Sequence, residues 1–551
     1  MTLLETEKYV KGTIARIGDS IYQPLEKIDR VKCRRLEYNQ REYVLESTEN
    51  WEEFDCSGTW GGKDYHICFA FTVTIPENAA GEEIVVRLAT GATDIWNTDN
   101  PQFIAYVNGG MVCALDMNHQ YIPLTKCAEG GENVDVRLYA YANTGRKNLF
   151  LDLTVNIFHR RIEEIYYDLK VPMDAACLMR DEEDEKRRIL HILKEAAAQI
   201  DFRQGFDSDY IISLERAGKY LKERLEANTE ENPVQVYSVG HTHIDVAWKW
   251  PIRQTKEKAL RSFLTVLYLM DEYPEYIFMS SQPQLYAYVK EECPEIYEKI
   301  KEKIKEKRWE PEGGMWVEAD CNISSGESLI RQIFYGKKFF ADEFGQGDNV
   351  VLWLPDVFGY SAALPQIMKK TGLKYFMTTK LGWNEKNKFP YDTMIWEGID
   401  GSEILAYFIT TRNYCTYPEL TRQESINTTY NGMENASQIM GTWQRYQNKE
   451  ISSRVLTCYG YGDGGGGSTR QMLEEGKRLA KGIPGVPKVR FSGVKEFFTD
   501  LEKELNGKKV PKWCGELYLE FHRGTYTSMA ENKKSNRFCE FLLQFTETLA
   551  A

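Results

Sequence analysis

The stretch that decides the fold is VQVYSVGHTHIDVAW, residues 234–248, in which an apolar run leads into two histidines and an aspartate. Side chains two positions apart point the same way in an extended strand, so His241, His243 and Asp245 are expected on one face at the strand's C-terminal end. Imidazole and carboxylate together suit zinc and its neighbours, whereas magnesium and calcium sites use oxygen almost throughout. The stretch therefore predicts half of a metal site, with an ordinary hydrogen-bonded strand end as the alternative.

Beyond residue 233 the sequence alternates between short apolar strands and amphipathic helices. The pattern predicts strands at 234–239, 276–280, 314–317, 350–354, 375–378, 404–409, 455–459 and 488–491, and helices at 256–270, 327–344 and 469–479. Such alternation argues for a parallel sheet or barrel, and active sites in these folds gather at the C-terminal ends of the strands. We therefore predict an α/β catalytic domain over residues 233–510.

The sequence before this domain has a different character. Short strands at 65–73, 84–88, 103–108 and 151–157, separated by Gly, Asn and Pro, predict a β-sandwich over residues 1–175. Apolar residues at three- and four-residue steps between 181 and 228 then predict a helical connector over 176–232.

A carboxylate follows each of two other predicted strands. The segment WLPDVFGYS, 353–361, places Asp356 where a strand opens into a glycine turn, as a candidate metal ligand or nucleophile, or as a helix cap. The segment YGYGDGGGGST, 459–469, places Asp463 in a turn before a helix; it lacks the lysine of a phosphate-binding loop, which disfavours a nucleotide site. The segment GELYLEFHRGTYT, 515–527, supplies the last histidine, His522, which alone would more often be structural.

Composition narrows the class of protein. The 551 residues are 42% hydrophobic and 27% charged with a net charge of −13, which is typical of a globular protein and makes nucleic acid an unexpected partner. No run of about 18 apolar residues predicts a membrane span, and the first residues lack the pattern of a secretion signal. The 12 cysteines are scattered singly, which fits reduced thiols in the cytoplasm better than a disulfide framework.

Taken together, these segments resemble glycoside hydrolase family 38, the class II α-mannosidases, in particular its cytosolic and bacterial branch. The resemblance rests on GHTHIDVAWKW (240–250), GGMWVEADCNISSGES (313–328), WLPDVFGYSAALPQI (353–367), YGYGDGGGGSTRQML (459–473) and GELYLEFHRGTYTS (515–528). It implies a seven-stranded β/α barrel followed by a three-helix bundle, of which residues 511–551 would form the opening part. Family members run on well beyond the barrel, so we expect this sequence to be truncated, with the apolar face of 531–551 exposed and activity in question.

The resemblance also implies the chemistry. One Zn²⁺, with Co²⁺ as an alternative, would be held by His243, Asp245, Asp356 and His522, and Asp356 would also be the nucleophile of a retaining exo-α-mannosidase. A retaining glycosidase needs a second, protonated carboxyl group, for which we choose Asp463, with Asp320 or Glu318 as competitors. The predicted substrate contacts to a mannose-containing oligosaccharide are Trp248, Lys380, His241 and Arg523.

Two alternative functions stay open at this point. A metal-dependent carbohydrate deacetylase on a related barrel would use an aspartate as a base toward metal-bound water. A truncated chain that binds mannosides without turnover is the other alternative. A homo-oligomer is expected from base rates only.

Overall fold

The structure is a computed structural model that describes residues 1–93, 101–203, 208–226, 232–416 and 427–551. Contacts divide the chain into two compact units. Unit 1 comprises residues 1–229, 247–274 and 462–478, and unit 2 comprises residues 230–246, 275–461 and 479–551. The chain therefore passes between the units several times, and the stretch 234–248 contributes to both.

A sandwich of two antiparallel sheets forms much of unit 1. One sheet has the strand order β1-β10-β5-β8 and the other β3-β2-β4-β9-β6-β7. Side chains from both sheets, such as Phe69 and Val155, share one hydrophobic core. The bounds are β1 Tyr22–Ile28, β2 Arg30–Leu36, β3 Glu52–Asp55, β4 Tyr65–Thr74, β5 Ile84–Ala89, β6 Gln102–Val107, β7 Gly110–Leu115, β8 Tyr121–Thr125, β9 Asn133–Ala142 and β10 Asp152–Phe158. The four predicted strands coincide with β4, β5, β6 and β10.

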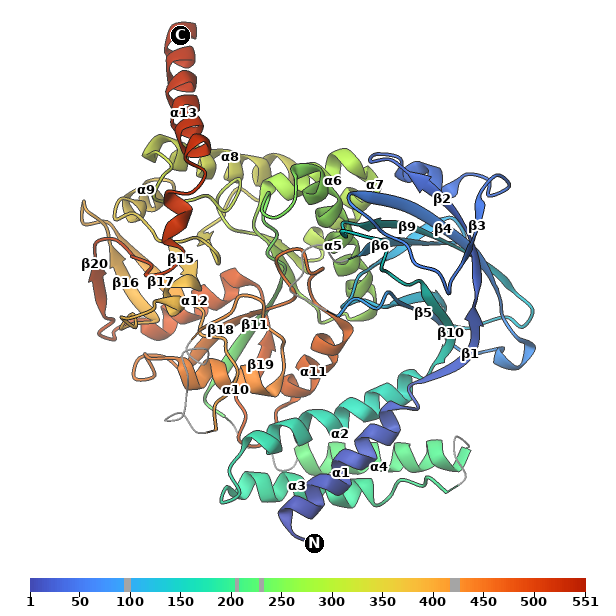
Figure 1. Ribbon diagram of the computed structural model, residues 1–551. Coiled ribbons are helices and arrows are strands. Elements are labelled where there is room, and N and C mark those ends of the chain that lie inside the picture. Colours follow the sequence, from blue (N-terminus) through green and yellow to red (C-terminus); the bar gives the residue numbers. More distant parts are fainter. Residues whose placement is uncertain (94–100, 204–207, 227–231, 417–426) are drawn as a thin grey trace. The chain divides into compact units, whose positions relative to one another are not determined.

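Helices α1 to α4 pack against one another in the same unit (Figure 1). Their bounds are α1 Leu3–Gly18, α2 Arg160–Leu178, α3 Asp184–Ala197 and α4 Ser208–Glu226. The prediction of β structure was wrong for α1 and for α2, whereas α3 and α4 account for the helical pattern at 181–228. A capping box at the start of α1, in which Thr2 and Glu5 bond each other's backbone N–H, is a sequence signal for this helix.

Unit 2 contains two five-stranded sheets whose strands pair in parallel, except for β16 with β17. The first has the order β13-β12-β11-β18 with β19 beside β11, and the second has the order β14-β15-β17-β16-β20. The bounds are β11 Gln235–His241, β12 Phe278–Ser280, β13 Trp309–Pro311, β14 Val351–Trp353, β15 Tyr375–Thr378, β16 Thr393–Glu397, β17 Glu403–Phe408, β18 Arg454–Tyr459, β19 Lys488–Phe491 and β20 Lys512–Cys514. The predicted strand at 314–317 was misplaced: pairing ends at Pro311, and Gly313 and Gly314 turn the chain with φ of 147° and 82°.

Helices separate these strands along the chain, and several of them contact the strands. Their bounds are α6 Pro283–Glu292, α7 Pro294–Lys305, α8 Gly326–Phe344, α9 Leu364–Lys370, α10 Ala436–Arg445, α12 Val494–Leu505 and α13 Ala530–Ala550; α5 Ile252–Glu272 belongs to unit 1, and α11 Arg470–Lys481 begins there. The predicted helices at 256–270, 327–344 and 469–479 coincide with α5, α8 and α11. Among the described residues, no helix has the length and apolarity that crossing a membrane requires.

Helix α13 carries an exposed apolar face. Phe538 and Leu543 are each 64% exposed and Leu549 is 88% exposed. Polar contacts tie α13 to α8 and its N-cap: Arg331 pairs with Glu547, and Glu540 accepts a hydrogen bond from the Ser325 backbone at 2.9 Å.

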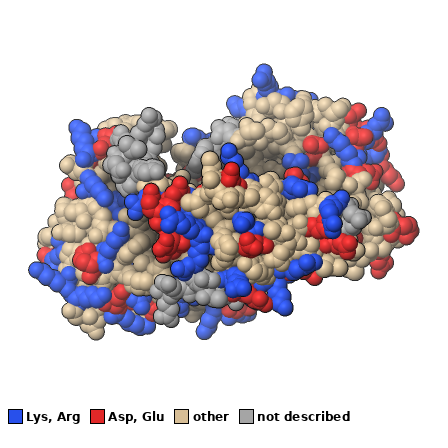
Figure 2. All heavy atoms as spheres, turned by 90° about the horizontal axis from the view of Figure 1, so that it is seen from below, with Lys and Arg blue, Asp and Glu red and all other residues tan. Residues whose placement is uncertain are grey.

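The surface drawn in Figure 2 carries basic and acidic side chains interspersed with each other.

Helix α8 packs closely on the backbone that follows β13, which leads to a stability prediction. A Cβ at Gly336 would lie 2.7 Å from the Gly314 carbonyl oxygen and 2.9 Å from the Trp316 nitrogen. Gly336→Ala is therefore expected to destabilise the chain by about 1–3 kcal/mol, because the helix must move away from this backbone. The matched control in the same helix is Gly326→Ala, where the added methyl meets nothing within 4 Å. Equal urea midpoints for the two variants would contradict the prediction.

Candidate active site

His241 is the last residue of β11 and points into the interior. It is 2% exposed; its Nδ1 lies 3.1 Å from the Met279 carbonyl oxygen, and Trp353 Nε1 donates to its Nε2 at 3.4 Å. Burial lowers the pKa of His241 to about 3, so the imidazole is neutral. Both ring nitrogens are thus engaged inside the protein. Because β11 ends here, strand alternation does not continue to His243 and Asp245, which lie in the irregular segment that follows.

His243 lies among three carboxylates. It is 4% exposed, and its Nε2 is 3.5 Å from Asp245 Oδ1 and 3.4 Å from Asp356 Oδ2, while its Nδ1 is 2.8 Å from Glu318 Oε2. Burial opposes a charge on this imidazole, but Glu318 and then Asp245 outweigh it and raise the pKa of His243 well above its ordinary value. One nitrogen of the ring therefore faces Glu318, and the other faces both predicted aspartate ligands.

Asp356 follows β14 and is fixed by several groups. Lys380 Nζ lies 2.6 Å from its Oδ1, and the Tyr430 hydroxyl donates to its Oδ2 at 2.8 Å. Burial disfavours the carboxylate, but hydrogen bonding with His243 and the charge of Lys380 outweigh burial and hold the pKa of Asp356 well below its usual value. The Asp356 carboxylate is consequently ionised.

The spacing of these donor atoms fits a small divalent cation. Ligands at ~2.0–2.1 Å from a tetrahedral zinc ion lie about 3.3–3.4 Å from one another. The separations from His243 Nε2 to Asp245 and Asp356 are 3.5 and 3.4 Å, close to that spacing. A carboxylate on the distal nitrogen, here Glu318, is the usual partner of a metal-bound histidine. These residues could therefore hold a metal ion of the zinc type.

His522 contacts aromatic side chains near Asp356. Its ring packs on Phe358, two residues after Asp356, at 4.7 Å between centroids, and lies 6.2 Å from Trp383. Burial, followed by the charge of Lys380, lowers the pKa of His522, which favours the neutral ring that a metal requires. Within the described residues, neither nitrogen of His522 forms a hydrogen bond. The next residue, Arg523, donates to the Tyr518 hydroxyl at 3.1 Å.

The remaining predicted residues divide between the units. Lys380, in unit 2, is buried, and its ammonium group pairs with the Asp356 carboxylate. Trp248 and Asp463 belong to unit 1. Trp248 is 51% exposed and packs edge-on against Trp250 at 5.8 Å between centroids. Asp463 has a left-handed backbone conformation, with φ of 54°.

Sequence reasoning gave Glu318 a different role and missed Tyr430. Glu318 was considered as an acid, but it faces His243 and accepts from the Ser281 hydroxyl at 2.8 Å. Tyr430 lies outside any motif, and no local signal identifies it. The other competitor, Asp320, accepts from the backbone N–H of Asn322 and Ile323 at 3.0 and 2.6 Å, which ties it to a turn.

Comparisons with known proteins bear on the family of this chain. A family profile described as the glycosyl hydrolases family 38 N-terminal domain matches residues 233–516. Alpha-mannosidase G of Dictyostelium discoideum is 36% identical over 478 residues, 83% of this chain and 42% of the relative. Alpha-mannosidase 2C1 of Homo sapiens is 35% identical over 396 residues, 72% of this chain and 36% of the relative.

A solved structure is also similar to this chain. An alpha-mannosidase from Enterococcus faecalis is 19% identical, with a TM-score of 0.42, and the match covers 52% of this chain and 31% of that one. The chain thus spans less than half the length of these relatives. Because the family profile covers 233–516 of the 551 residues, the chain belongs to glycoside hydrolase family 38.

Proposed function

We propose that this chain carries the catalytic centre of a retaining, zinc-dependent exo-α-mannosidase that removes terminal α-mannose from oligosaccharides. The observation that carries the proposal is the donor set of His243, Asp245 and Asp356, with Asp356 ionised between Lys380 and Tyr430. The two curated relatives described above are both named alpha-mannosidases, which supports mannose as the sugar.

The chemistry proceeds through a covalent glycosyl–aspartate intermediate. Asp356 attacks the anomeric carbon while Asp463 gives its proton to the departing glycosidic oxygen, so that the C–O bond to the leaving group breaks as the bond to the carboxylate forms. Asp463 then takes a proton from the incoming water, whose oxygen displaces Asp356 with net retention of configuration. Lys380 and Tyr430 hold the nucleophile ionised and oriented, because each contacts one of its oxygens.

His243, Asp245, Asp356 and His522 would hold the metal. When bound, a zinc ion acts as a Lewis acid that orients sugar hydroxyl groups. Nitrogen and carboxylate ligands suit zinc, with cobalt as an alternative. Glu318 orients His243 through its other nitrogen, and Trp248 and Arg523 stay predicted substrate contacts. The burial of His241, with both ring nitrogens facing protein groups, does not fit the substrate contact predicted for it.

We also propose that the parallel strands of unit 2 belong to one seven-stranded β/α barrel over residues 233–510, between a β-sandwich with helical connector and the first part of a helical bundle. Two contacts support closure between the sheets. The backbone N–H of Trp353 in β14 donates to the carbonyl oxygen of Gly313, just after β13, at 3.2 Å. The Tyr407 hydroxyl of β17 accepts from the Leu456 backbone of β18 at 2.9 Å.

A reducing compartment, the cytoplasm, is the proposed location. All 12 cysteines lie in the described ranges and each is a free thiol. Structural disulfides form in oxidising compartments, so free thiols favour a reducing one.

Hydrolysis of 4-nitrophenyl α-mannoside tests the function. We expect release of mannose, with the α-anomer appearing first in proton NMR, and loss of activity on prolonged treatment with a chelator that added zinc reverses. First appearance of the β-anomer would contradict the retaining mechanism. Acetate release from an acetylated sugar without glycosidic cleavage would instead select a deacetylase.

A further inference from the structure

A buried ionic cluster in unit 1 lies against the glycine-rich loop that carries Asp463. The loop, Gly462–Gly467, has left-handed backbone at Asp463, Gly464, Gly466 and Gly467, with φ of 54°, 85°, 92° and 88°. Left-handed backbone is unfavourable for a residue with a side chain such as Asp463, so this conformation needs support from the surrounding structure. The support comes from side chains of unit 1.

Asp116, on the turn between β7 and β8, is the centre of the cluster. Its side chain is 5% exposed; one oxygen pairs with Arg261 of α5, and the other accepts from His119 Nδ1 at 2.9 Å. The same oxygen accepts from the backbone N–H of Asn118 at 2.8 Å. Arg261 is itself 2% exposed and donates through Nε to Gln102 at 3.1 Å. Each charge in the cluster therefore has a partner of opposite sign, as burial requires.

The remaining donors of this cluster bind backbone carbonyl groups of the loop and of Ser468, the residue that follows it. The three contacts are Arg261 Nη2 to the Gly464 carbonyl oxygen at 2.5 Å, Asn118 Nδ2 to that of Gly465 at 3.0 Å, and His119 Nε2 to that of Ser468 at 2.9 Å. His119 faces an acceptor on both ring nitrogens, so it donates from both as an imidazolium. The loop therefore receives hydrogen bonds from two parts of unit 1, the β7–β8 turn and α5.

Gly466 allows this close approach. A Cβ at this position would overlap the Asp116 carboxylate and lie 2.9 Å from Arg261 Nη1. The end of the loop is held separately, because Arg470 at the start of α11 pairs with Glu163 of α2 at 2.8 Å through Nε. The loop therefore fits closely against the cluster.

We propose that Asn118, His119 and Arg261, organised by Asp116, are positioning residues that fix the loop and thereby the carboxyl group of Asp463. The inference rests on the proposed function, in which Asp463 is the acid. The sandwich then has a catalytic role without touching substrate: it supplies the turn that orients a loop more than 300 residues away in the sequence, as in the separation of 349 residues between His119 and Ser468. Displacement of a catalytic group by about 1 Å can cost about 100-fold in rate.

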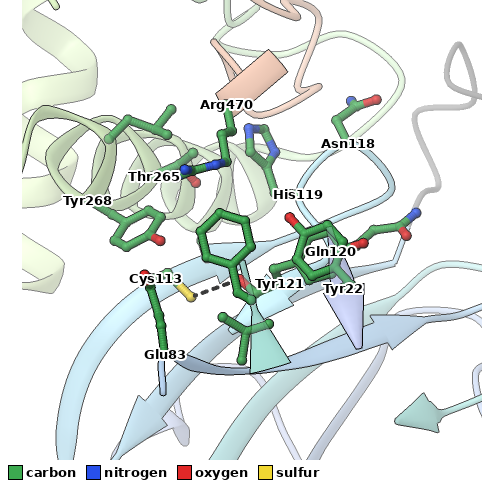
Figure 3. Close-up of a pocket in the computed structure, with 14 residues that line it drawn as sticks. Tyr22, Glu83, Cys113, Asn118, His119, Gln120, Tyr121, Thr265, Tyr268 and Arg470 are labelled. Carbon is green, nitrogen blue, oxygen red and sulfur yellow. Dashed lines mark hydrogen bonds between the residues drawn. The ribbon is translucent and has the colours of Figure 1, made fainter. Parts of the chain in front are cut away.

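The structure also indicates which variants will fold. Asn118 and His119 line a cavity of about 90 Å³ together with Tyr22, Tyr121, Tyr268 and Arg470 (Figure 3). A changed side chain at either position therefore has adjacent space, unlike one at the buried Arg261. Asn118→Ala removes one hydrogen bond to the loop, and His119→Gln removes the charge and shortens the reach.

The test compares two mannosides that differ in their need for acid. A 2,4-dinitrophenyl group leaves without protonation, whereas the alkoxide of methyl α-mannoside must be protonated. We expect Asn118→Ala and His119→Gln to lower kcat/KM for the methyl glycoside by about tenfold or more, and that for the activated glycoside by less than about twofold. Asp463→Ala is the reference and should show the same pattern with a larger loss.

His66→Gln is the matched control. His66 is also buried in unit 1 and contacts α5, through Glu257 at 3.1 Å, but it does not touch the loop. It should leave the ratio of the two rates unchanged. Equal losses on both substrates for Asn118→Ala and His119→Gln, or no loss, would overturn the positioning role while Asp463→Ala keeps its pattern. If Asp463→Ala shows no dependence on the leaving group, the proposed acid itself is wrong.

Discussion

Asp356→Asn is expected to lower kcat/KM for an aryl α-mannoside by at least about 1000-fold. The amide oxygen that replaces the carboxylate is a poor nucleophile, and the charge that Lys380 and His243 hold in place is lost. The effect should appear even with an activated leaving group, because bond formation to the anomeric carbon is itself impaired. Asparagine has almost the same shape, so the side chain can stay in place.

The control for this variant is Asp342→Asn on α8, whose side chain is 57% exposed and pairs with Lys338. It should match the unmodified chain in rate and in unfolding midpoint. A fluorinated mannosyl fluoride that forms a slowly hydrolysed intermediate should label the peptide containing Asp356. Labelling of another peptide, or retention of more than a tenth of the activity by Asp356→Asn, would remove Asp356 as the nucleophile.

His243→Ala is expected to abolish stoichiometric zinc binding, and the mannosidase activity with it. The variant removes the imidazole nitrogen that lies 3.5 Å from Asp245 and 3.4 Å from Asp356, so the two carboxylates lose the proposed nitrogen ligand beside them. Glu318→Gln should have a graded effect, weakening zinc binding by about 10- to 100-fold, because the group that orients a metal-bound histidine contributes on this scale. Elemental analysis at controlled free zinc measures both effects.

Two further measurements separate a metal effect from a folding effect. His191→Ala changes an exposed histidine of α3 and should keep full zinc content. Saturating zinc should restore most of the activity of Glu318→Gln but not that of His243→Ala. Unchanged zinc content in His243→Ala would contradict the proposed ligand set and require another site for the ion.

Local sequence signals predicted the regular elements well where one face of the element is buried. The strands β15 and β18 and the helix α8 follow directly from apolar runs and from periodicity of three and four residues. The strand expected at 314–317 failed because an apolar run does not reveal which residues find pairing partners. Here Gly313 and Gly314 turn the chain, and the pairing lies earlier, at Trp309–Pro311.

The residues of the candidate site could likewise be predicted from the sequence only in part. Its histidine and aspartates could be singled out from the sequence, because they follow apolar strands and are chemically able to bind a metal. Glu318 and Tyr430 could not be assigned their partners, since their contacts with His243 and Asp356 join residues 75 and 74 positions apart. The contact between His241 and Trp353 is likewise a property of packing between strands.

The sequence by itself determined the family, the alternation of strands and helices and the choice of candidate site residues, because these depend on residue type and local spacing. Only the tertiary structure decided that His241 is engaged inside the protein while His243 faces Asp356, and that the turn carrying Asp116 binds the loop of Asp463. The physical reason is that hydrogen bonds and charges act over a few ångströms in space. Chain folding, and not sequence distance, sets which groups come within that range.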